Sequence, residues 1–362
     1  MAPRAQDARP PASPLAVWVA LLIVYVVWGS TYLAIRVMVE TMPPFLAAGI
    51  RFAIGGVVLA AVLLARGGPS RLRVSRAELA SAALVGSLLL FIGNGLVSLG
   101  EQSVPSGLAA LIVGVIPLIV LLLRGIAGEP VSRAAMGGVA MGFVGLAVLV
   151  VPRGLDGSVA IAGIIYLLIA STAWATGSFL SRRIPLPRDP FVSTMYQLLT
   201  AGVLLLAWSL VTGEWSTVHP ADFSAASLWS LAYLIVFGSL VAYSAYTWLL
   251  QHAPISKVAT YAYVNPVVAV ALGALILGEA VPVSTLLGAA MIVLSVAFIV
   301  WKDSGPEPRK LAEVAEVAEV SEVALEPRAV ALEPRAVPLE PRTVLPEPRA
   351  VSLEPPEAGP SA

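Results

Sequence analysis

Cysteine is absent from this chain of 362 residues, charged residues make up only 12% of it, and lysine occurs only at Lys257, Lys302 and Lys310. The lack of thiols excludes disulfides and thiol chemistry. No lysine lies in a glycine-rich turn and no GxxxxGK[ST] loop occurs, which excludes ATP hydrolysis by this chain. No nucleophile stands beside a base at the mouth of an apolar segment, so we expect no enzyme activity. His219 and Asp222 have no second histidine or cysteine nearby, so we expect no metal site and no cofactor.

Apolar sequence dominates instead: 58% of the residues are hydrophobic and the mean hydropathy is +0.88. A chain of this composition needs lipid as its solvent. Apolar stretches of about 20 residues, the length of a bilayer-spanning helix, follow one another with short breaks. We expect ten transmembrane helices over residues 15–38, 44–65, 78–99, 105–123, 134–151, 159–180, 190–211, 226–250, 258–277 and 282–301. The sequence therefore predicts an all-α polytopic membrane protein.

Basic residues are distributed unevenly between the expected loops. If the N-terminus lies in the cytoplasm, the outer loops hold only Arg36 and Arg153. The inner segments then hold Arg4, Arg9, Arg66, Arg71, Arg73, Arg76, Arg124, Arg133, Arg182, Arg183, Arg188, Lys257 and Lys302. Because lysine and arginine near helix ends are retained on the cytoplasmic side, this bias predicts an even number of helices and two cytoplasmic termini.

The apolar part of the chain is internally duplicated. Trp28, Arg36, Pro44 and Phe45 recur as Trp174, Arg182, Pro190 and Phe191, and Gly128-Glu129 recurs as Gly278-Glu279. The segment VPSGLAALIVGVIP at 104–117 aligns with APISKVATYAYVNP at 253–266. Each unit holds five expected helices, and an odd number places the two units in opposite orientations. Inverted repeats are an architecture of secondary transporters, with the substrate site near the midplane at the repeat interface.

Four segments carry a resemblance to a known family: WGSTYLAIR at 28–36, PPFLAAGIRF at 43–52, GNGLVSLGEQSVPSGLAALI at 93–112, and YAYVNPVVAV followed by LGE at 261–279. Over about residues 15 to 301 the chain resembles the drug/metabolite transporter superfamily in its EamA type, and within it the YedA-like branch of metabolite exporters. The resemblance implies ten helices in two inverted five-helix repeats, and export of amino acids, other small metabolites or drugs. It does not fix the substrate, because one fold serves many ligands.

Arg51 is the only ionisable residue well within an expected span, and such a residue usually faces a cavity or a partner. Asn94 and Glu101 belong to the neighbouring antiparallel helix and its outer end, so the three could form a polar ladder. Arg51 would be held by Glu101 in one state and bind an anionic or carboxylate-bearing substrate in another. A purely structural pair of Arg51 and Glu101 remains the alternative. Glu101 is also a candidate coupling residue, as a proton carrier, although an exchanger or a facilitated exporter is equally consistent.

Trp28 and Trp174 lie in mid-membrane at matching positions of the two repeats. They line a cavity wall, or else they face lipid or pack in the core. An indole in a bundle interior usually needs a hydrogen-bond partner, and Ser30, Thr31 and Thr176 lie close by in sequence. With Tyr32, Arg51 and Asn94 they belong to the candidate substrate-binding residues.

Two expected helices carry a proline in mid-span, Pro117 and Pro266. A proline frees a backbone carbonyl that must be satisfied within the membrane. We expect these two residues to act in gating, with a static kink as the alternative. Tyr263 and Asn265, which precede Pro266, complete the candidate substrate-binding residues.

The chain divides into four parts. A polar segment at 1–14, without the features of a cleavable signal, precedes the repeats at 15–152 and 153–302. Residues 303–362 form a tail in which the unit EPRAVAL recurs from Glu326. A proline in every unit excludes a coiled coil, so we expect a disordered cytoplasmic tail.

These patterns together favour a secondary transporter in a bacterial cytoplasmic (inner) membrane that exports amino acids, related metabolites or drugs by alternating access. The alternatives are an uptake permease or exchanger for small organic anions, and a channel-like protein without a transport cycle. The expected partners are a small-molecule substrate and the lipid bilayer. No nucleic acid is expected, and a homodimer stays open.

Overall fold

A computed structural model describes residues 13–129, 131, 133–155, 159–253, 258 and 260–303. The first part of the chain is a helical unit within Met1–Gly305. The unit Pro306–Ala362, and with it the predicted disordered tail, lies outside the described residues. Among the described residues every regular element is helical, which confirms the all-α class.

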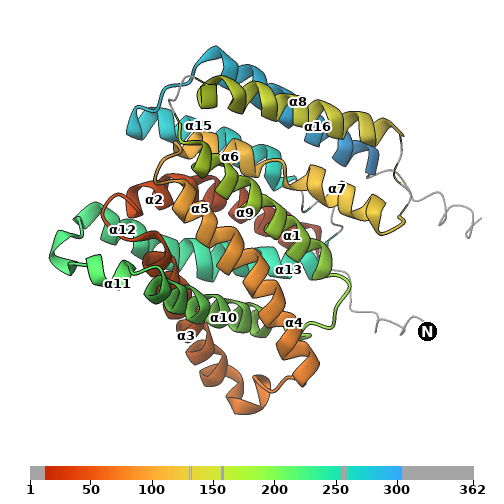
Figure 1. Cartoon of the computed structure of the whole chain (residues 1–362). Helices are drawn as coiled ribbons and strands as arrows, with labels where there is room; N and C mark the ends of the chain where they lie inside the picture. Colours follow the sequence, from red (N-terminus) through yellow and green to blue (C-terminus); the bar gives the residue numbers. More distant parts are fainter. Residues whose placement is uncertain are drawn as a thin grey trace, which may run out of the picture. The chain divides into compact units, whose positions relative to one another are not determined.

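The helices of the first repeat are α1 (Pro14–Ile23), η1 (Val24–Trp28), α2 (Gly29–Met38), α3 (Pro44–Arg71), α4 (Arg76–Gly86), η2 (Ser87–Asn94), α5 (Gly95–Gly100), α6 (Ser106–Val113), α7 (Ile116–Ile126) and α8 (Arg133–Leu155). Those of the second repeat are α9 (Ile161–Leu180), α10 (Pro190–Val211), α11 (Glu214–Thr217), η3 (Pro220–Asp222), α12 (Ala225–Tyr233), η4 (Leu234–Tyr243), α13 (Ser244–His252), α15 (Tyr261–Leu277) and α16 (Val283–Asp303). Figure 1 shows how they are arranged.

Each predicted span corresponds to one helix or to consecutive helices. Seven segments of the described chain are long and apolar enough to cross a membrane, and three shorter apolar stretches lie in α8, α15 and α16. The protein is therefore a polytopic membrane protein of two inverted five-helix repeats. α3 was predicted to end at residue 65 and continues to Arg71, interrupted at Gly68, where φ is 66° and Pro69 follows.

Local sequence sets several helix ends. Asp189 precedes Pro190 and accepts a hydrogen bond from Phe191 N at 2.9 Å, so α10 begins with a side-chain cap and a proline in its first turn. Gly128 and Gly278 follow helices at matching positions of the repeats and have φ of 80° and 66°. This left-handed conformation favours glycine, which explains why the duplicated Gly-Glu pair ends a helix in both repeats.

Each of the major helix contacts joins one repeat to the other. α3 packs on α10, α6 on α15 and α8 on α16, and these are pairs of equivalent helices. Figure 1 shows α8 and α16 side by side. The segment of η2 and α5 packs on α9, and its equivalent, η4 and α13, packs on η1 and α1. In both directions, the third span of one repeat thus packs on the first span of the other, as a pseudo-two-fold axis requires. The repeat interface therefore forms the centre of the bundle.

In the described part of the chain, three of the long helices contain a π-helical section, η1, η2 and η4. η1 ends at Trp28 and η2 ends at Asn94. π-helical turns inside α-helices occur frequently at functional sites, because they redirect the side chains that follow. Both of these residues belong to the candidate site.

Candidate functional site

A cluster of aromatic rings lies at the repeat interface. Trp28 and Trp174 meet edge to face, with ring centroids 5.4 Å apart. Tyr246 lies 4.8 Å from the Trp28 ring and 5.9 Å from the Trp174 ring, and Tyr261 lies 5.4 Å from Trp28. We call Trp28, Trp174, Tyr246 and Tyr261 the aromatic cluster. The duplicated tryptophans thus touch each other, which their matching places next to a pseudo-two-fold axis explain.

The polar atoms of the aromatic cluster are only partly satisfied. The Tyr246 hydroxyl is hydrogen-bonded to Ser178 Oγ at 2.9 Å. The Trp174 Nε1 is buried near the hydroxyls of Tyr246 and Tyr261 without meeting hydrogen-bond geometry. An indole N–H in an apolar interior normally has an acceptor. This N–H can therefore donate a hydrogen bond to a ligand, or to one of the two tyrosine hydroxyls after a small shift of that side chain.

Arg51 is buried, with 3% of its surface exposed, and reaches across to two other helices. Its Nε donates to Ser239 Oγ at 2.9 Å, and its Nη1 donates to Asn94 Oδ1 at 3.2 Å. The Phe52 ring lies 4.8 Å from the guanidinium carbon. Both hydrogen-bond acceptors are neutral, and among the described residues no carboxylate lies within ion-pair distance of Arg51. The guanidinium therefore carries a buried charge without a counter-ion.

The Arg51 site adjoins the aromatic cluster. A Cβ at Gly93 would lie 3.3 Å from Trp174, and Gly93 directly precedes Asn94. On the other side, a Cβ at Gly238 would lie 2.8 Å from Arg51 Nη2 and 3.3 Å from Thr31 Cγ2. Gly93 thus allows the Trp174 indole to approach the backbone of η2, and Gly238 allows the Arg51 guanidinium to approach the backbone of η4. The structure brings together Trp28, Trp174, Arg51 and Asn94, four of the residues that the sequence singled out.

The contact expected between Arg51 and Glu101 is not formed. Glu101 lies seven residues beyond Asn94, about 10 Å further along the helix axis, so a guanidinium that reaches Asn94 cannot also reach Glu101. Glu101 is fully buried, and neither carboxylate oxygen has a hydrogen-bond partner. Arg36 donates through Nη1 to the backbone carbonyls of Glu101 and Gln102, at 2.9 Å for Gln102. Burial raises the pKa of Glu101 well above its usual range, the Glu279 carboxylate adds to the rise, and Arg36 opposes it.

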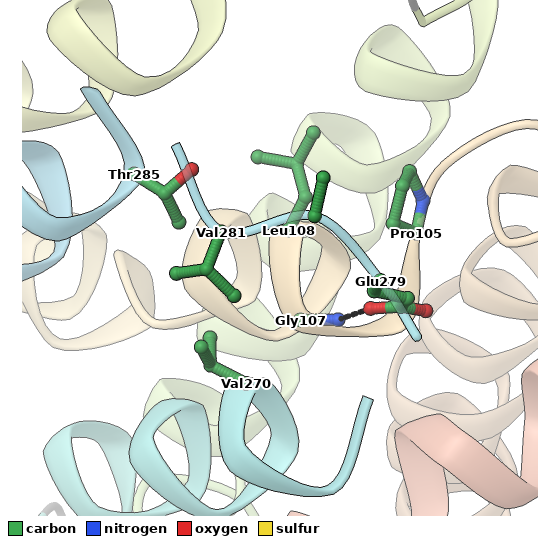
Figure 2. Close-up of a pocket in the computed structure, with 8 residues that line it drawn as sticks. Pro105, Gly107, Leu108, Val270, Glu279, Val281 and Thr285 are labelled. Carbon is green, nitrogen blue, oxygen red and sulfur yellow. Dashed lines mark hydrogen bonds between the residues drawn. The ribbon is translucent and has the colours of Figure 1, made fainter. Parts of the chain in front are cut away.

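Glu279 connects the second repeat to the start of α6. Its Oε1 accepts hydrogen bonds from Ser106 N at 2.7 Å and Ser106 Oγ at 2.8 Å, and its Oε2 accepts one from Gly107 N at 3.0 Å. Figure 2 shows this carboxylate at the edge of a small pocket that Leu108 and Val281 also line. We call the three hydrogen bonds the Glu279 cap. An anionic side chain at a helix N-terminus is favoured by the helix dipole and by the free N–H groups.

Three of the remaining candidates lie on α7 and α15. Pro117 lies in the first turn of α7, directly after the break between α6 and α7, whereas Pro266 lies inside the continuous helix α15. Gly114 at the break packs on Pro266, since a Cβ there would lie 3.3 Å from the proline ring. Asn265 is buried, and the amide orientation that satisfies its hydrogen bonds directs the nitrogen to the carbonyls of Tyr25 at 3.2 Å and Tyr261 at 3.3 Å.

Two further candidates are the tyrosines at 32 and 263. Tyr32 is partly buried on α2, close enough to Glu101 and to Tyr261 for electrostatic interaction with both. The side chain of Tyr263 lies outside the described residues.

The sequence did not single out Ser239 and Tyr246. Both stand in an apolar span, where a single hydroxyl is a weak pattern. The π-helical sections that orient Asn94 and Ser239 have no sequence pattern at all, because they depend on the packing of neighbouring helices.

Comparison with known proteins places the chain in a family. The model of the EamA-like transporter family matches it twice, over residues 15–151 and 161–301. The inner membrane transporter YedA of Escherichia coli K12, itself named as uncharacterized, is 39% identical over 281 residues, which cover 77% of this chain and 89% of YedA. A "Probable amino-acid metabolite efflux pump" of Salmonella typhimurium LT2 is 27% identical over 289 residues, or 75% of this chain and 90% of that protein.

A solved crystal structure supports the fold. It superposes with a TM-score of 0.57 at 21% identity, covering 79% of this chain and 96% of that chain. At this identity the likeness shows the architecture alone. The family match extends over most of the chain, and the relatives are membrane transporters by name. The protein is a multi-pass membrane transporter and not an enzyme, and it belongs to the EamA-like transporter family of the drug/metabolite transporter superfamily.

Proposed function

We propose that this transporter exports small metabolites that carry a carboxylate, such as amino acids, by alternating access. The observation that carries the proposal is the Arg51 guanidinium, which has no counter-ion among the described residues. A charge buried in a membrane protein is costly unless it is paired or serves a ligand, and Ser239 and Asn94 supply only neutral partners. A guanidinium offers a planar fork of donors that matches a carboxylate.

The surroundings of Arg51 suit such a ligand. The aromatic cluster supplies apolar walls beside the charge, and its tyrosine hydroxyls and the Trp174 N–H supply additional polar contacts. Small-molecule sites typically combine an apolar wall with a few placed polar groups. The cluster and Arg51 lie at the repeat interface, where transporters of inverted repeats bind their substrates. The name of the Salmonella relative supports amino acids as the substrate class.

The distribution of basic residues orients the bundle in the membrane. It supports two cytoplasmic termini, which places Glu101 and the Glu279 cap at the outer end of the bundle. With α6 capped by Glu279 from the other repeat, this end is tied together. We assign Pro117 and Pro266 to the bending of α6–α7 and α15, since Gly114 packs on Pro266 where these two equivalent helices meet.

A metabolite profile tests the proposal. Cells with and without the gene are grown on minimal medium, and the medium is compared by mass spectrometry. We expect a carboxylate-bearing metabolite to accumulate only with the gene. Purified protein in proteoliposomes should then exchange that metabolite faster when the vesicles are preloaded with it, because a carrier returns faster when loaded. Identical media contradict export. Flux that neither saturates nor responds to preloading indicates a channel, and exchange without export indicates an organic-anion exchanger.

A further inference from the structure

Two carboxylates at one end of the bundle have opposite environments. Glu279 accepts three hydrogen bonds, two of them from backbone N–H groups at the start of α6. Glu101 accepts none with its carboxylate, although it is fully buried. Hydrogen bonds to the charged form favour the charged form, whereas burial without partners favours the neutral one. Glu279 thus has the hydrogen-bond partners that a carboxylate accepts from, and Glu101 lacks them.

The groups around Glu101 do not neutralise a second charge. Tyr32 and Arg36 approach it from α2, and Glu279 approaches it from the loop that precedes α16. Arg36 directs Nη1 to the backbone carbonyls of Glu101 and Gln102, not to the carboxylate. On the side of α9, a Cβ at the neighbouring Gly100 would meet Leu167 and the Gly163 carbonyl, neither of which titrates. Two nearby carboxylates disfavour ionisation of both, so one of them holds a proton.

The Glu279 cap fits closely around the carboxylate. Position 273 must be small, because a Cβ there would lie 2.4 Å from Glu279 Oε2 and 2.8 Å from Ser106 Oγ. The cap is also the described polar link between the loop before α16 and the start of α6. Any separation of α6 from that loop would break the cap and admit water to both carboxylates.

We propose that Glu101 is a proton-binding site: it is a carboxylic acid while the Glu279 cap is formed, and it releases its proton when this end opens. The proton passes to water at the open end, leaving a solvated carboxylate, and returns to the same oxygen pair on closure. The closed state binds the proton more tightly than the open state, so acid favours closure and rising pH favours opening. Protonation itself does not depend on the proposed function, whereas its role in a transport cycle rests on it.

Infrared difference spectroscopy of the purified, reconstituted protein during a pH titration tests the protonation directly and needs no substrate. We expect a carboxylic-acid C=O band that persists at pH values where glutamic acid in water is ionised, and that Glu101→Gln removes. Glu279→Gln should move the titration of this band to lower pH, because a neighbouring negative charge is lost. Glu40→Gln, at an exposed glutamate, is the matched control and should leave the band unchanged. Absence of the band in wild type, or its survival in Glu101→Gln, overturns the proposal.

Cysteine labelling tests the link to opening in a chain that has no cysteine of its own. Leu108→Cys places a thiol in the pocket that Glu279 also lines, at a residue that is 2% exposed, and Gln102→Cys provides an exposed reference that corrects for thiol reactivity. We expect the labelling rate of Leu108→Cys, divided by that of Gln102→Cys, to rise at least several-fold with pH over the range in which the infrared band disappears. In Glu101→Gln this ratio should stay low at every pH. A ratio that rises equally in Glu101→Gln overturns the link. If Glu101→Gln does not accumulate, Glu279→Gln must shift the rise to lower pH, and an unshifted rise contradicts the proposal.

Discussion

Replacing Arg51 by glutamine separates a substrate-binding arginine from a structural one. The substitution removes the hydrogen bonds to Ser239 and Asn94. Hydrogen bonds to charged groups contribute about 1.5–3 kcal/mol each, so their loss destabilises by about 3–6 kcal/mol. The substitution also removes a buried charge, whose desolvation costs several kcal/mol. Because the two terms oppose each other and are similar in size, we expect a net stability change of no more than about 2 kcal/mol.

Transport should respond differently. A carboxylate that loses its charged partner loses about 1.5–3 kcal/mol of binding, which corresponds to about a 10- to 150-fold higher KM for export of the metabolite found by profiling. Arg66→Gln, an exposed arginine on the same helix, is the matched control and should change neither stability nor transport.

The assay combines thermal melting of detergent-purified protein with initial export rates at equal membrane abundance. If Arg51 belonged to a buried ion pair, its substitution would destabilise the protein by about 3–5 kcal/mol, because the partner charge would be left unpaired. A loss of this size in the free energy of unfolding derived from melting, together with an unchanged KM, refutes the reasoning and makes Arg51 structural. Wild-type export by an Arg51→Gln protein of normal stability refutes the substrate role outright.

Three further predictions concern orientation, the tail and packing. Single cysteines at Arg73 and Gln102 should be labelled from the cytoplasm and from the outside, respectively, by a membrane-impermeant reagent, and the reverse pattern would invert the proposed topology. Truncation after Asp303 should leave export unchanged at equal abundance, because a proline-rich repeat cannot contribute a packed helix, and a large loss would make the tail functional. Gly202→Ala should destabilise by about 1–3 kcal/mol in thermal melting, because the new Cβ would lie 2.6 Å from a backbone nitrogen of α3. Gly137→Ala, which meets no atom within 4 Å, should be neutral or slightly stabilising, and equal effects would contradict the packing.

The spans and the two-repeat organisation were predictable from sequence, because a bilayer imposes a fixed helix length and a duplicated sequence folds twice in the same way. α10 occupies residues 190–211, as predicted, because Asp189 and Pro190 mark its start independently of its neighbours. The proximity of Trp28 to Trp174 also follows in part from the duplication, since equivalent residues next to a pseudo-two-fold axis meet each other.

The polar contacts were not predictable in the same way. Arg51 and Glu101 lie near the same membrane surface in sequence terms, yet η2 and η4 direct Asn94 and Ser239 to the guanidinium. The partners of Glu279 lie 172 and 173 residues away along the chain. Hydropathy predicts how deep a residue lies in the membrane, because depth is set by the position of the residue along its own apolar segment. The direction in which a side chain points around that helix depends on π-helical turns and on the close approach of glycines to neighbouring helices, and only the packed bundle determines these.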